Sequence, residues 1–158
     1  IRTGMPLVER VMCVTGERIP KPGNFLVRVG TSLREIVEHC GGITGEDVTV
    51  KTGGPMMGTK QATLDIPVIK ATNGLIACET DHSVAVSCIK CGRCADVCPM
   101  ELFPLYFARY LEDGNLHGLK DRSILDCIEC GCCEYICSSK IPLVTKIKEG
   151  KAAVRGMK

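Results

Sequence analysis

Residues 88–98 read CIKCGRCADVC and residues 127–137 read CIECGCCEYIC, and these two stretches decide the fold of the second half of the chain. Both have the spacing Cys-x2-Cys-x2-Cys-x3-Cys, and each cysteine of the second run follows its counterpart in the first at a constant offset. Three thiolates from one tight loop can bind three corners of a four-iron cluster, and this spacing is typical of 4Fe-4S ligation. The two runs therefore predict two such clusters and transfer of single electrons.

The last cysteine of each run is expected to cross to the other cluster, as it does in proteins with two clusters of this kind. Cys132 competes with its neighbour Cys133, but only Cys133 keeps the spacing. The first cluster is thus expected on Cys88, Cys91, Cys94 and Cys137, and the second on Cys127, Cys130, Cys133 and Cys98. The remaining thiols, Cys13, Cys40 and Cys78, are expected to be packed side chains rather than ligands. We predict no catalytic acid–base residue.

Two other uses of these cysteines fit the sequence less well. Zinc also binds four thiolates, but typically through two Cys-x2-Cys pairs with a longer spacer, which consecutive triplets fit poorly. Disulfides would require an oxidising compartment. The sequence contains neither a signal-peptide pattern nor an apolar run of about eighteen residues. We therefore expect reduced thiols that bind iron.

The composition argues against a nucleic-acid partner. The formal net charge is only +2 and aromatic residues make up 4% of the chain, so there is no basic surface interleaved with aromatic side chains. Residues 140–158 are locally basic, and we expect these charges on a solvated helix face, with docking to an acidic surface as the alternative.

Residues 1–76 predict a small mixed α/β sheet domain. Residues 25–29 are rich in strand-forming side chains and follow a turn at 22–24. Ser32 and Glu35 form a capping-box pattern at the start of a helix that we expect to end at Gly41. Further strands are expected at 48–50 and 66–70.

Residues 77–158 predict a helical domain that carries the clusters. We expect a crossover over 71–86, and then helices over 104–111 and 118–125 and after Pro142. Together the two domains predict the α+β class.

Several of these stretches resemble the C subunit of the Rnf electron transport complex. Its cluster segment is matched by SCIKCGRC at 87–94, CPM at 98–100, DCIECG at 126–131 and IPLV at 141–144. Its SLBB segment, a β-grasp fold, is matched by NFLVRVGT at 24–31, GGPMMG at 53–58 and KATN at 70–73. The likeness covers nearly the whole chain.

This resemblance implies an SLBB-like β-grasp domain over 1–76 and a ferredoxin-type domain with two 4Fe-4S clusters over 77–158. It implies the electron-relay part of a ferredoxin:NAD oxidoreductase complex that translocates ions, and thus part of a translocase when full-length. Such proteins bind FMN and NADH in an N-terminal domain, which we expect this chain to lack. The expected partners are other Rnf subunits and, for electrons, ferredoxin or the flavin domain. The expected location is peripheral, on the cytoplasmic face of a bacterial or archaeal membrane.

Two alternatives to this interpretation stay open. A flavoprotein reductase outside Rnf, such as a microcompartment corrinoid reductase or a reductase-associated electron carrier, has a similar layout. The SLBB-like half could also be a ligand-binding module accompanied by purely structural clusters, since a fold by itself does not determine function.

Overall fold

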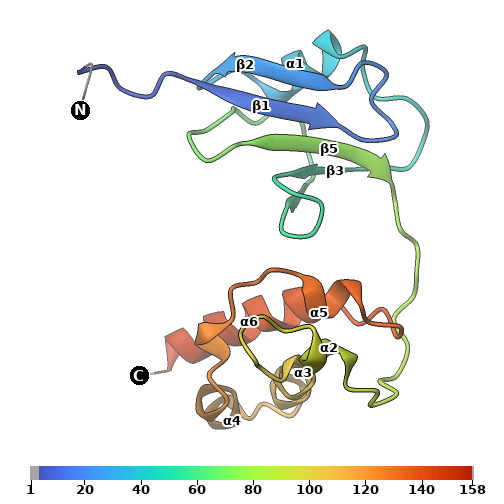
Figure 1. Ribbon diagram of the computed structural model, residues 1–158, viewed down its shortest axis with the longest axis vertical. Coiled ribbons are helices and arrows are strands. Elements are labelled where there is room, and N and C mark those ends of the chain that lie inside the picture. The colour runs from blue at the N-terminus through green and yellow to red at the C-terminus, as the bar shows by residue number, and fades with distance from the viewer. Residues whose placement is uncertain (1–3, 158) are drawn as a thin grey trace. The chain divides into compact units, whose positions relative to one another are not determined.

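The computed structural model describes residues 4–157 and separates into two units, the first ending at Asp81 and the second beginning at His82 (Figure 1). Each unit has its own hydrophobic core. The boundary predicted from the sequence, between residues 76 and 77, falls inside a strand of the first unit.

The first unit is built on a mixed five-stranded sheet. Its strands are β1 (Glu9–Thr15), β2 (Gly23–Arg28), β3 (Val48–Thr52), β4 (Thr59–Gln61) and β5 (Gly74–Glu79), arranged in the order β2-β1-β5-β3-β4. β1 and β2 form an antiparallel hairpin, whereas β1 and β5 are parallel. β3 is antiparallel to both β4 and β5. The predicted α+β class is confirmed.

Helix α1 (Leu33–His39) covers one face of this sheet with Leu33, Ile36 and Val37, which are all buried. The Ser32 hydroxyl accepts a hydrogen bond from the Arg34 amide at 3.2 Å. Ser32 thus caps the helix as predicted, although its partner is the Arg34 amide and not that of Glu35, which the predicted capping box requires. The Leu33 and Arg34 amides donate to the carbonyls of Ile66 and Leu64. The segment after β4 thus completes the cap.

Two predictions for residues 66–86 were wrong. Residues 66–70 form only an isolated bridge between Ser32 and Pro67 instead of a strand, because proline has no N–H to donate to a ladder. Residues 74–79, expected within a crossover, form the central strand β5. Both neighbours of β5 are strands, and five of its six residues are buried or half-buried. Its sequence therefore lacks the alternation of polar and apolar residues that identifies a half-exposed strand.

Cys13 is exposed, contrary to the expectation of a packed thiol, whereas Cys40 is fully buried. Successive side chains of a strand point to opposite faces of the sheet. Met12 and Val14 of β1 are both fully buried, so Cys13 between them faces the other way.

The second unit consists of short helices and ligand loops. They are α2 (Arg93–Asp96), α3 (Pro104–Glu112), α4 (Leu116–Asp121), the 3-10 turn η1 (Ile124–Asp126), α5 (Cys132–Tyr135) and α6 (Leu143–Gly156). α3 begins at Pro104, as predicted. α4 begins two residues before the predicted start because the Asn115 side chain accepts a hydrogen bond from the Gly118 amide at 2.9 Å. Among the helices within residues 4–157, none is both long and apolar enough to cross a membrane.

Helix α6 packs closely against α4 and η1. A Cβ added at Gly150 would lie 2.7 Å from Ile124 Cδ1 and 3.3 Å from Leu119 Cδ1, so the ends of these two side chains would have to shift to make room for it. Ile147 and Val154 on α6 are buried in the same core as Phe107. This close approach brings α6 up to the second ligand loop.

Candidate metal centres

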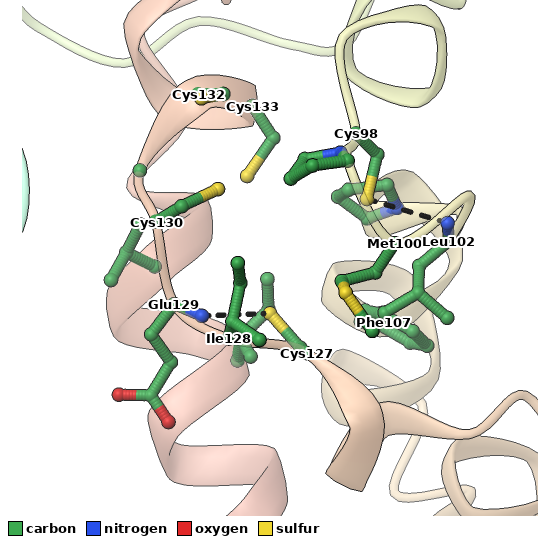
Figure 2. A pocket seen from close by; sticks show the side chains of 15 residues that line it. Cys98, Met100, Leu102, Phe107, Cys127, Ile128, Glu129, Cys130, Cys132 and Cys133 are labelled. Atoms are coloured by element: carbon green, nitrogen blue, oxygen red, sulfur yellow. Dashed lines mark hydrogen bonds between the residues drawn. The ribbon is translucent and has the colours of Figure 1, made fainter.

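Four thiols, one from the first cysteine run and three from the second, line a common cavity. They belong to Cys98, Cys127, Cys130 and Cys133, and Figure 2 shows their sulfur atoms turned toward the same space. Phe107 of α3 and Ile147 of α6 contribute apolar walls. This group of thiols is called the second centre below.

The other four predicted ligands line a separate cavity, called the first centre below. They are Cys88, Cys91, Cys94 and Cys137, and the apolar side chains beside them include Leu105 and Leu143. The space lined by each group of thiols and not occupied by protein atoms is about 380 Å³, part of which is open to solvent. Each centre therefore combines three thiols of one loop with the last thiol of the other loop, which is the grouping that the spacing predicts.

The two ligand loops have the same backbone geometry. Lys90 and Glu129 occupy equivalent places and both have φ of 56°. Their amides donate to the sulfur atoms two residues earlier, Lys90 N to Cys88 Sγ at 3.3 Å and Glu129 N to Cys127 Sγ at 3.4 Å. Gly92 and Gly131 follow with φ of 80° and 83°, a left-handed conformation that glycine adopts at little cost. The loops thus present their sulfurs in the same way.

A further amide supports the second centre from the opposite loop. The Leu102 amide donates to Cys98 Sγ at 3.3 Å. N–H groups directed at ligand sulfurs stabilise negative charge there, and such hydrogen bonds are one of the factors that set cluster potentials.

Burial makes these thiols hard to ionise on their own. Burial, together with the smaller effect of the neighbouring Cys127, raises the pKa of Cys133 to about 12. Burial also raises the pKa of Cys94 and of Cys127. Because the thiolate is the form that binds metal, a bound cation must supply the stabilisation that water would otherwise give. The donor set therefore fits iron held in a largely apolar cavity.

The thiols do not converge as ligands of one ion would. Among residues 4–157, no three His, Cys, Asp or Glu side chains are placed to hold a single metal ion. A fifth thiol, Cys132, also borders the second cavity, and its side-chain hydrogen bond with Cys130 raises its pKa.

Two polar residues that organise the centres were not predicted from the sequence. The first, Ser139, is 4% exposed, and its hydroxyl donates to the Ser87 carbonyl at 3.1 Å while its own carbonyl accepts from the Val86 amide at 3.0 Å. These bonds hold the segment before Cys88 beside the end of the second run.

Lys151 is the other such residue. It is an exception to the expectation of a solvated basic helix face, which Lys148 and Arg155 meet because both are exposed. Lys151 is 5% exposed and binds Glu129, and this hydrogen bond lowers the pKa of Glu129. Helical spacing could have predicted this burial from the sequence. Lys151 lies four residues after Ile147 and three before Val154, so it is on the same face of the helix as these two buried residues.

Comparison with known proteins identifies both units. Residues 11–60 match the SLBB domain family and residues 87–141 match the 4Fe-4S dicluster domain family. The chain is 40% identical over 154 residues to the C subunit of the ion-translocating oxidoreductase complex of Rhodobacter capsulatus, an alignment that covers 96% of this chain and 30% of the relative.

Two further relatives carry more specific names. The chain is 39% identical over 156 residues to the C subunit of the Na(+)-translocating ferredoxin:NAD(+) oxidoreductase complex of Acetobacterium woodii, covering 96% of this chain and 35% of the relative. It is 41% identical over 107 residues to the C subunit of the proton-translocating ferredoxin:NAD(+) oxidoreductase complex of Clostridium ljungdahlii, covering 66% and 23%. The chain spans about a fifth to a third of the length of the curated relatives it matches.

Proposed function

We propose, since this chain belongs to the C-subunit family of ion-translocating oxidoreductase complexes, that its second unit relays single electrons between two 4Fe-4S clusters. The observation that carries this proposal is the division of eight thiols between two cavities, with each run contributing three thiols to one and its last thiol to the other. Sharing of the loops in this way would keep the two clusters close neighbours.

The bound clusters would supply the redox chemistry, because each accepts or releases one electron. The residues of this chain act by ligation and by control of the surroundings. The first centre would be held by Cys88, Cys91, Cys94 and Cys137, and the second by Cys127, Cys130, Cys133 and Cys98. Apolar walls limit the access of water, and amide donors such as Leu102 N stabilise charge on the sulfurs.

The partners follow from the relatives. Those from Acetobacterium woodii and Clostridium ljungdahlii are named as subunits of ferredoxin:NAD(+) oxidoreductase complexes. We propose that this chain acts in such a complex, with ferredoxin or a flavin domain as its redox partner. Its attachment to the membrane would be peripheral, on the cytoplasmic face and through other members of the complex.

Anaerobic reconstitution is expected to load about eight irons and eight sulfides per chain, as two four-iron clusters require. Dithionite should reduce the product, whereas NADH should not, since the sequence has neither a Rossmann nor a Walker pattern. Metal and sulfide analysis, with electron paramagnetic resonance of the reduced protein, checks this. A zinc-only product or a single cluster would contradict the proposal, and reduction by NADH would reveal a nucleotide site in this chain.

A further inference from the structure

Lys151 places a buried cation beside the second centre. Its Nζ donates to the Cys127 carbonyl oxygen at 2.5 Å and to Glu129 Oε1 at 2.6 Å. Glu129 lies between two of the predicted ligands, Cys127 and Cys130. A buried ammonium is costly unless it is paired and hydrogen-bonded. These two contacts therefore hold Lys151 in place and connect α6 to the middle of the ligand loop.

The position of Lys151 depends on the close packing of α6. Gly150, the preceding residue, lets the helix approach Ile124 and Leu119 with no side chain between them. Val144 and Ile147 of the same helix line the cavity of the second centre. Helix α6 thus supplies both one wall of the cavity and the cation that binds the ligand loop of the second centre.

The ligand loop of the first centre has the same backbone conformation as that of the second, but it carries a lysine where the second carries a glutamate. Lys90 corresponds to Glu129, with the same φ of 56° and the same type of amide–sulfur bond. Lys90 is exposed. The first loop therefore carries a solvated positive charge, whereas the second carries a carboxylate paired with a buried ammonium.

We propose that Lys151 is a positioning residue that clamps the loop of the second centre to α6 and, together with Glu129, makes the two centres electrostatically unequal. This inference rests on the proposed electron relay. Reduction adds negative charge to a cluster, so a nearby cation favours it and a nearby anion opposes it. Water screens partly buried charges less than exposed ones. Glu129 and Lys151 should therefore shift the potential of the second centre in opposite directions.

The test is a potentiometric titration, followed by electron paramagnetic resonance, of the whole reconstituted chain and of two variants that keep side-chain size. Glu129→Gln leaves Lys151 unbalanced and is expected to raise the reduced-to-oxidised ratio of the second centre about tenfold at a fixed solution potential, a shift of about 59 mV for one electron. Lys151→Met leaves Glu129 unbalanced and is expected to lower that ratio by a similar factor. The first centre is the internal reference and should not move.

Iron retention tests the clamp separately. Lys151→Met should release iron to a chelator several-fold faster than the unmodified chain, and complete loss of about four irons with the first centre intact would also support the clamp. If Lys151→Met fails to fold, the potential of the second centre in Glu129→Gln still tests the inference. That variant is expected to fold because it keeps the hydrogen bond between Lys151 and the Cys127 carbonyl.

The matched control is Lys148→Met, which removes an exposed lysine of the same helix. The charge of Lys148 also lowers the pKa of Glu129, but water screens an exposed charge more strongly than a buried one. This variant should therefore have little effect on the potential of the second centre or on iron release.

Unchanged potentials with unchanged iron release would overturn the inference, and so would shifts of both variants in the same direction. These outcomes are distinct from failure of the proposed function. If the unmodified chain holds no pair of reducible clusters, the electron relay is wrong and the inference falls with it. If it holds both clusters but neither their potentials nor the rate of iron release depends on Glu129 and Lys151, only the inference is wrong.

Discussion

Replacing Cys98 by alanine is expected to remove the second centre and to leave the first, although Cys98 belongs to the first cysteine run. Its thiol lines the cavity of Cys127, Cys130 and Cys133, and its sulfur accepts a hydrogen bond from the Leu102 amide there. Iron should fall from about eight to about four per chain, since a four-iron cluster is lost as a unit. Metal analysis after anaerobic reconstitution measures this.

Double variants decide which thiols share a cluster. Cys98→Ala combined with Cys127→Ala should retain about four irons, because both changes affect one cluster, whereas Cys98→Ala combined with Cys91→Ala should retain none. The reverse result would show that each run holds its own cluster and would refute the crossed assignment. Cys132→Ala is the matched control and should keep both clusters, even though this thiol borders the second cavity.

Removing the iron is expected to unfold the second unit and leave the first folded. Among the residues that the structure describes, the hydrophobic core of the second unit contains eight buried residues and surrounds two cavities that the clusters would fill. In the folded second unit several non-glycine residues, including Lys90 and Glu129, have left-handed backbone conformations, and these cost conformational energy that the clusters would offset. Metal binding that forms a site also contributes folding free energy, so loss of the metal should destabilise the whole second unit. The first unit has a separate core under α1.

Hydrogen exchange read by mass spectrometry on the whole chain, before and after anaerobic removal of iron, measures this difference. Amides of residues 93–156 should lose their protection, whereas those of residues 9–79 should keep it. Persistent protection of the second unit would show that its helices are stable without clusters. The converse control is Leu33→Ala, which should destabilise the first unit by about 2–5 kcal/mol and leave the iron content unchanged, since Leu33 is 1% exposed in the other core.

Local features of the chain were predictable because their causes lie within a few residues. Ser32 caps α1 through the amide two residues later, and Pro104 opens α3, as the sequence indicates. The cap formed by Asn115 was overlooked, although an asparagine three residues before Gly118 is a recognisable signal. The family and the fold class are confirmed, whereas the crossed ligand sets stay a prediction for which the two cavities supply the geometry.

By itself the sequence determined that the chain carries two runs of four cysteines with the same spacing, because the spacing of residues along a tight loop is a local property. Only the tertiary structure decided that residues 74–79 lie in the middle of the sheet and that Lys151 is buried against Glu129. Both depend on contacts between segments far apart in the chain: β5 is held between β1 and β3, and Lys151 is brought to the ligand loop by the packing of Gly150 against Ile124. Contacts between distant segments cannot be predicted from local sequence patterns, because those patterns describe only residues that are close together in the chain.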